Sequence, residues 1–262
     1  MYKSIISLSW MVISFSVAVA QDTQVNQAAP VRKVSATPKP PGNFIKINLL
    51  GLPLRNFSFQ YERVLSKRIS LALGYRFMPS GPLPLLSTIE SIAGSEDPST
   101  KEALRSLNIS NTAITPELRF YVGRKGYGRG FYLAPYYRYA TFNVKGLKVE
   151  LDNGNDNIVF SGKLTTQNIG FMLGAQWMIS KRISLDWWIV GAQIGSHSSN
   201  LKGEKDIPLT DDERADIERF SKDITFPNLN LKTEFIDNNT ASITTSGPWA
   251  GLRAGLCLGI RF

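Results

Sequence analysis

The residues with the clearest capacity for nucleophilic chemistry lie in the run His197-Ser198-Ser199, which contains the single histidine of the chain. A serine becomes a nucleophile when an imidazole and an acid lie within hydrogen-bond reach, and Glu204 and Asp206 follow a few residues later. Such a site is defined by its geometry and not by closeness in the sequence, and this spacing is common. We therefore expect no catalytic residues, with a hydrolytic site at His197 and Ser199 as the alternative.

The chain contains few cysteine and histidine residues that could bind a metal ion or form a disulfide. Cys257 is the single cysteine, so an intrachain disulfide cannot form. One histidine and one cysteine also give no cluster of ligands for a metal ion. We expect no metal and no other cofactor.

A second set of reactive residues is charged and lies at alternate positions of apolar segments. Arg119, for example, stands between Leu118 and Phe120. Because successive side chains of a β-strand point to opposite faces, these charges are predicted to share one face. The set consists of Glu62, Arg76, Glu117, Arg119, Arg138, Asp186 and Arg253.

Eight segments with this alternation could position the charges. The last is the clearest, with Leu258, Ile260 and the terminal Phe262 on one face and glycines and arginines on the other. Alternation over about ten residues is typical of strands with lipid on one side and a crowded interior on the other. After residue 42 no segment has about 18 consecutive apolar residues, which excludes a membrane helix. The eight segments span residues 44–52, 56–62, 69–77, 114–120, 131–139, 168–177, 183–189 and 249–262.

The connections alternate in length. Short joins are expected at 66–68, 123–130 and 180–182, and long ones at 79–111, 143–162 and 196–247. Short turns at one end and long loops at the other are typical of outer-membrane proteins. The sequence thus predicts an all-β fold, a closed antiparallel up-and-down transmembrane β-barrel of eight strands, with short periplasmic turns and long extracellular loops that contain short helices.

Helical signals in the long loops support the last point. Thr210 and Glu213 form a capping box, and Ile217, Phe220 and Ile224 follow at helical spacing. Two similar signals begin at Ser87 and Ser99. These helices would form a lid or docking surface, or would cover the end of the barrel.

The first residues have the composition of an export signal. Lys3 supplies an early positive charge, residues 5–19 are largely apolar, and Ala18-Val19-Ala20 ends the run with small residues. We expect a signal peptide over residues 1–20 that is cleaved after Ala20. Residues 21–43 contain four prolines and are predicted to form a disordered periplasmic lead-in, with the barrel over residues 44–262.

The short turns are basic and contain no acid. Their bases would face the anionic headgroups of lipids on the periplasmic side. The formal net charge of +9 invites comparison with nucleic-acid-binding proteins, but the sequence has no folded basic face for such a ligand. The turn residues are Lys67, Arg68, Arg124, Lys125, Arg129, Lys181 and Arg182.

Two blocks, "FIKINLLGLPLRNFSFQYERVLSKRISLALGYRF" and "ITPELRFYVGRKGYGRGFYLAPYYRYATF", together with the aliphatic C-terminus, carry a resemblance to a known family. The chain resembles Bacteroidetes-type outer-membrane β-barrels of unknown function over most of residues 44–262. The resemblance implies a small barrel comparable to the eight-stranded OmpA and OmpX types. It implies no activity and no catalytic residue.

An eight-stranded barrel leaves an interior that side chains fill, which argues against a wide pore. Buried charges must be paired, so we expect an ion-paired plug. We expect a non-catalytic integral protein of the cell outer membrane whose extracellular loops serve surface interaction or envelope integrity. The alternatives are a deacylase-like, lipid-modifying enzyme and a narrow channel. Expected partners are outer-membrane lipid, the barrel-assembly machinery during insertion, and an unknown extracellular or periplasmic protein.

Overall fold

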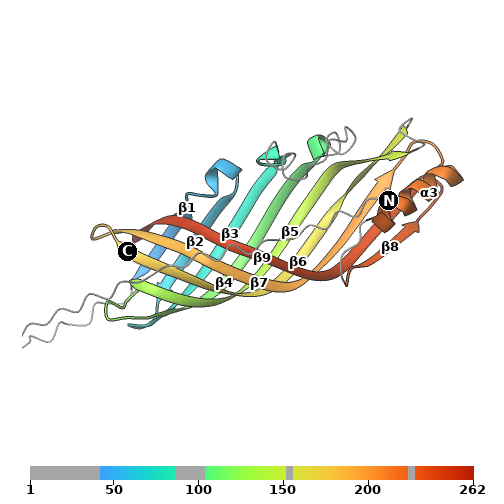
Figure 1. The fold of residues 1–262 in the computed structure, drawn as a ribbon. Helices are drawn as coiled ribbons and strands as arrows, with labels where there is room; N and C mark the ends of the chain where they lie inside the picture. Colours follow the sequence, from blue (N-terminus) through green and yellow to red (C-terminus); the bar gives the residue numbers. More distant parts are fainter. Residues whose placement is uncertain (1–41, 87–103, 152–155, 224–227) are drawn as a thin grey trace, which may run out of the picture. The chain divides into compact units, whose positions relative to one another are not determined.

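A computed structural model describes residues 42–86, 104–151, 156–223 and 228–262 (Figure 1). The chain divides into two units, Met1–Pro38 and Lys39–Phe262, and all described residues belong to the second. The predicted signal peptide and the lead-in up to residue 41 lie outside the described residues. So do the helices that we expected to begin at Ser87 and Ser99.

The described part is almost entirely β-structure, as the alternating segments predict. All strand pairs are antiparallel. The main elements are β1 (Asn43–Asn48), η1 (Leu52–Leu54), β2 (Phe57–Val64), β3 (Ile69–Pro82), β4 (Asn108–Tyr121), β5 (Gly130–Leu151), β6 (Asp156–Met178), β7 (Ile183–Glu204), α3 (Asp211–Asp223), β8 (Asn230–Phe235) and β9 (Thr240–Arg261).

The strands form one up-and-down sheet whose hydrogen bonding closes into a ring. Strands that follow one another in the sequence pair from β1 to β7, and β7 then pairs with β9. The ring closes because β9 also pairs with β1, with Ile45 opposite Ile260. Within the described residues, eight strands make the ring, and β8 is a ninth that extends the sheet along β9.

One end of the ring, the turn end, holds the short connections and both Asn43 and Phe262. Two of its turns are alike: Ser66 Oγ accepts hydrogen bonds from the N–H groups two and three residues later, and Ser180 Oγ does the same. The sequences around these serines are also alike, Ser66-Lys67-Arg68-Ile69 and Ser180-Lys181-Arg182-Ile183, so one type of hairpin turn is used twice. We call the opposite end the loop end.

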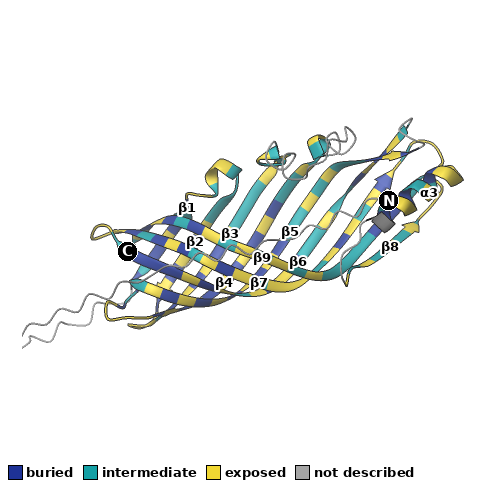
Figure 2. Ribbon diagram, viewed as in Figure 1, coloured by how far each residue is buried: buried dark blue, intermediate teal, exposed yellow. Residues whose placement is uncertain are grey.

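Burial alternates along each strand of the ring, as Figure 2 shows. Outward positions are apolar and exposed: Leu252 is 82% exposed, Ile194 66% and Ile169 64%. Inward positions hold charged groups and aromatic rings. The ring of Tyr132 occupies the place of a side chain at the opposite Gly174, where a Cβ atom would lie 2.3 Å from Tyr132 Cζ.

Four strands, β5, β6, β7 and β9, continue well beyond the ring at the loop end (Figure 1). With β8 they form an extended sheet, and α3 contacts its two outer strands, β5 and β8. A hydrophobic core fills the space between sheet and helix. Its buried members are Val149, Leu151, Ile158, Phe160, Leu209, Ile217, Ala241 and Ile243. We call this part the cap.

The cap corrects two of the expected loops. Most of the connection predicted at 143–162 is strand, and the connection predicted at 196–247 contains the end of β7, α3, β8 and the start of β9. A bulge between Val144 and Leu147 explains the first error. The extra residue reverses which side chains of β5 face inward, so the alternation changes phase and looks broken in the sequence.

Strands β1 and β2 are short, so the wall of the ring is incomplete near the loop end. Residues 257–261 of β9 pair with β1, and residues 241–246 of β9 pair with β8. Between Ser246 and Cys257, β9 has β7 on one side, and no described strand pairs with its other side. We call this stretch of β9 the side break.

Candidate functional site

The interior near the turn end is filled by a network of ion pairs. Lys46 lies at its centre and donates hydrogen bonds to Glu62, to Gln176 and to Asp186, whose Oδ2 is 2.6 Å away. These four residues come from β1, β2, β6 and β7, and their side chains are fully buried or nearly so. The network therefore ties together distant strands of the ring.

Arg119 of β4 is the second cation of the network. Its Nη1 lies 2.7 Å from Asp186 Oδ2 and 3.2 Å from Glu62 Oε2. Its Nε and Nη2 donate to Glu117 Oε2, and Nη2 also donates to Gln60 Oε1. A guanidinium group has five N–H donors in a fixed plane, which suits it to bridge several acceptors at once.

Neutral donors complete the shells of the two central acids. Tyr121 donates to Glu62 over 2.6 Å, and Tyr132 donates to Asp186 over 2.7 Å. Trp188 Nε1 adds a longer bond of 3.3 Å to Asp186. Since a buried carboxylate without donors would be very unfavourable, these aromatic residues belong to the network as much as the charges do.

Arg253 of β9 ends the network on its loop-end side. Its Nη1 donates to Glu117 Oε1, and its guanidinium carbon lies 4.0 Å from the ring centre of Trp188. The network then has three cations and three acids, so it is neutral as a whole. Its charged members are Lys46, Arg119, Arg253, Glu62, Glu117 and Asp186.

A cavity of about 460 Å³ lies on the loop-end side of the network. Arg76, Arg138 and Arg253 all line it. Arg76 donates to Asn111 Oδ1, whereas Arg138 has neither a hydrogen bond nor an ion pair in the described part of the chain. None of the described side chains that line the cavity is acidic.

All seven charged residues selected from the sequence lie on the inward face of the ring. Five meet in the network, and Arg76 and Arg138 stand beside it at the cavity. Our selection omitted Lys46, although its alternation with Ile45 and Ile47 put it on the same face. It also omitted inward tyrosines and glutamines, because nothing in their types distinguishes a network member from a packing residue. These are Gln60, Tyr121, Tyr132 and Gln176.

His197 and Ser199 do not bond to each other directly. Ser199 Oγ lies 2.7 Å from Thr245 Oγ1, which in turn lies 3.3 Å from His197 Nε2. The other ring nitrogen of His197 lies 3.3 Å from the carbonyl oxygen of Pro248. Neither Glu204 nor Asp206 forms a hydrogen bond with the imidazole, whose partners among the described residues are Thr245 and Pro248.

The basic residues of the short turns lie at the turn end. Six are exposed and Arg129 is partly buried, with hydrogen bonds to the carbonyl groups of Lys125 and Gly126. Leu258, Ile260 and Phe262, which form the apolar face of the last expected segment, are exposed on the outward face.

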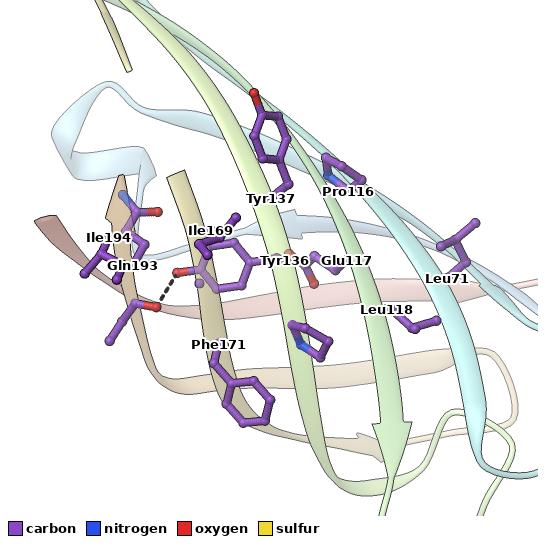
Figure 3. Close-up of a pocket in the computed structure, with 13 residues that line it drawn as sticks. Leu71, Pro116, Glu117, Leu118, Tyr136, Tyr137, Ile169, Phe171, Gln193 and Ile194 are labelled. Atoms are coloured by element: carbon purple, nitrogen blue, oxygen red, sulfur yellow. Dashed lines mark hydrogen bonds between the residues drawn. The ribbon is translucent and has the colours of Figure 1, made fainter. Parts of the chain in front are cut away.

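An apolar groove of about 770 Å³ lies in the outer wall over β3 to β7 (Figure 3). Leu71, Leu118 and Phe171 line it from the outward face. The hydroxyl of Tyr136 reaches through to the carbonyl oxygen of Ala192, 3.4 Å away. Pro116 and Pro135 line the groove where pairs between β4 and β5 are missing, because proline has no backbone N–H to donate, and Gly170 lines it from β6.

Among the described residues, no group of His, Cys, Asp and Glu is arranged to hold a metal ion. In the same part of the chain, no helix has the length and apolar character to cross a membrane.

A comparison with curated proteins found no match to the chain. The sequence model of one family matches residues 42–195, and that family is described as "Protein of unknown function (DUF3575)". The matched range includes every charged member of the network except Arg253, and it ends before the cap helix. Since this range is more than half of the chain, the protein belongs to the DUF3575 family of proteins of unknown function.

Proposed function

We propose that the protein is an integral outer-membrane β-barrel, exported by a cleaved signal peptide, whose interior is plugged by the ion network and whose cap is displayed at the cell surface. In this proposal it is a non-catalytic barrel of the small OmpA or OmpX type. Its role is surface interaction or envelope integrity, carried out by the cap.

The observation that carries the proposal is the band of apolar side chains on the outward face of the ring. Ile169, Phe171 and Ile194 are more than half exposed and lie on neighbouring strands. A soluble protein rarely exposes a continuous apolar surface of this extent. Lipid in contact with this band would remove the cost of exposing it to water.

The interior supports a plug over a channel. Every charged member of the network has a partner of opposite charge, and the network side chains are almost fully buried. An ion pathway would have to break these pairs in a medium of low dielectric constant, where unpaired charges are costly. The absence of a described acid on His197 and of a Ser–His hydrogen bond favours a non-catalytic role.

Three measurements test the proposal. Membranes from expressing cells should release the protein only with detergent, and unboiled protein should migrate differently in SDS gels from boiled protein. In planar bilayers the purified protein should give no stable unitary current. Protein that remains in the aqueous fraction would overturn the membrane location, and large stable currents would overturn the plug.

The surface display of the cap has a test of its own. A protease or an antibody directed at α3 should reach its target on intact cells, while the turn around Arg124 should be protected until the outer membrane is opened. The reverse pattern would show that the cap faces the periplasm.

A further inference from the structure

The cavity on the loop-end side of the network has an excess of positive charge. The six charged residues of the network balance one another, and Arg76 and Arg138 are additional. Arg138 is 7% exposed, and its Nη2 is buried with no hydrogen-bond partner among the described residues. Repulsion from Arg76 and Arg253 adds to the cost of keeping this charge inside the ring.

The three guanidinium groups reach the cavity from three different strands, β3, β5 and β9. Arg76 and Arg253 each use one side on a fixed acceptor, Asn111 and Glu117, which holds the side chains in place. Arg138 has all its donors free among the described residues. A fixed set of guanidinium groups around an empty space is suited to bidentate contacts with an oxygen anion.

Neutral polar groups around the cavity fit the same ligand. Asn48, Asn56 and Gln193 line it, and the side-chain oxygens of Asn56 and Gln193 are buried without a partner in the described part of the chain. A carboxamide can present either its oxygen or its NH₂ group, so these residues can supply further donors. With no acid in the described lining, nothing in this wall repels an anion.

The cavity lies next to the side break in the wall of the ring. Gly251, Leu252 and Ala254 of β9 line the cavity, and the turn that contains Leu50 and Leu54 lines it from the other side. No strand among those described joins these two segments. Leu252 and Leu50 are 82% and 56% exposed, so apolar surface borders the break.

We propose that this cavity binds a phosphate or carboxylate group, held by Arg138 together with Arg76 and Arg253. The group belongs either to a small anion that enters from the loop end or to the head of an amphiphile that reaches in through the side break. This inference does not depend on the membrane location, because the charges and the cavity are inside the ring in any surroundings.

The experiment compares three purified proteins in micelles of a non-ionic maltoside, which carries neither phosphate nor carboxylate: wild type, Arg138→Met and Arg124→Gln. Arg124 is an exposed turn residue and provides the matched loss of one positive charge away from the cavity. Sodium phosphate replaces sodium chloride at constant ionic strength, and binding is followed by calorimetry and by the midpoint of thermal unfolding. A parallel series adds phosphatidylglycerol to the same micelles, with diacylglycerol, which has no phosphate, as the control lipid.

Phosphate or phosphatidylglycerol should raise the unfolding midpoint of wild type and of Arg124→Gln. Arg138→Met should bind about tenfold more weakly or worse, because it loses charge-assisted hydrogen bonds. It should also be more stable than wild type without the anion, since an unpaired buried charge is gone. A response to free phosphate identifies a small anion, and a response only to the lipid identifies an amphiphile.

Two results would overturn the proposal. One is an equal response to the anion in wild type and in Arg138→Met. The other is no response of wild type to either probe. Should Arg138→Met fail to fold, Arg76→Gln in the same titration decides the matter, because it removes a second cavity charge and leaves the network intact.

Discussion

Arg119 and Asp186 form an ion pair across the interior of the ring, with Arg119 Nη1 2.7 Å from Asp186 Oδ2. They belong to β4 and β7, which are separated in the sheet by β5 and β6. The pair thus joins strands that share no backbone hydrogen bonds. Lys46 of β1, which is separated from β7 by β9, binds the same carboxylate. Four interior donors converge on Asp186, and another four, including the same Lys46 and Arg119, converge on Glu62.

Replacing Asp186 by Asn should destabilise the protein strongly. Lys46 and Arg119 would lose a shared anion while remaining buried, and the removal of one partner from a buried ion pair costs about 3–5 kcal/mol. The midpoint of urea unfolding, followed by tryptophan fluorescence in micelles, measures the change. Asp206→Asn is the matched control, because Asp206 is exposed and should tolerate the change. Equal midpoints for the two variants would show that the network contributes little to stability.

Phe171→Arg tests the surroundings of the outward face. Phe171 is 51% exposed near the middle of β6. A charged residue on the lipid face of a barrel costs about 2–4 kcal/mol near the middle of the bilayer. Ile207→Arg, at a residue that is 58% exposed next to the cap, should cost little. Unfolding measured in lipid vesicles compares the two, and a harmless Phe171→Arg would mean that water covers the outward face.

Much of the ring could be predicted from the sequence because its alternation is regular. Each of the eight expected segments overlaps a ring strand, and around the ring these strands stand in their sequence order. The ninth strand could not be found in this way. Thr240 to Ser246 contains many polar residues, and β8 alternates over only six residues, which is too short a run to stand out in the sequence. β8 is stabilised by pairing with β9 and by the cap core.

The site was predictable to a similar degree. Alternation identifies which residues face inward, so the seven charges and the position of Lys46 could be read from the sequence. It does not say which charge meets which, because that depends on the register of strands on opposite walls. The cavity and the side break were not predictable at all. The side break follows from the short lengths of β1 and β2, and β1 ends at Asn48, before the end of the expected first strand, 44–52. The cavity depends on how inward side chains from many strands meet inside the ring.

Ile217→Ala tests whether the cap is a folded unit with its own core. The Ile217 side chain is fully buried between α3 and the extended sheet, and shortening a buried isoleucine to alanine costs about 2–5 kcal/mol. Hydrogen exchange should increase in α3 and β8, while the ring strands near the network keep their protection. Ile207→Ala, at an exposed position, is the control. Increased exchange throughout the ring would show that cap and ring unfold together.

The start of α3 is held by two linked contacts. Glu213 accepts a hydrogen bond from the Thr210 backbone N–H over 2.9 Å, and its own N–H donates to Thr210 Oγ1, which confirms the capping box expected from the sequence. Lys205 pairs with Glu213 and, over 2.7 Å, with Asp156. These hydrogen bonds, that from Lys205 foremost, lower the pKa of Glu213 below its ordinary value.

We therefore expect the helix to loosen in acid. A carboxyl group whose pKa is lower in the folded than in the unfolded protein stabilises the fold above its unfolded pKa, about 4.3, and loses this contribution as the pH falls through the folded value. Protection of the α3 amides against hydrogen exchange, corrected for the intrinsic rate, should fall below about pH 4 in wild type. Glu213→Gln should lower the protection at neutral pH and remove most of the acid response, whereas Glu204→Gln, an exposed neighbour, should behave as wild type. If α3 of Glu213→Gln lost as much protection in acid as α3 of wild type, other groups would control the acid response. The ion pair of Glu213 with Lys205 would then contribute nothing measurable to the stability of the helix.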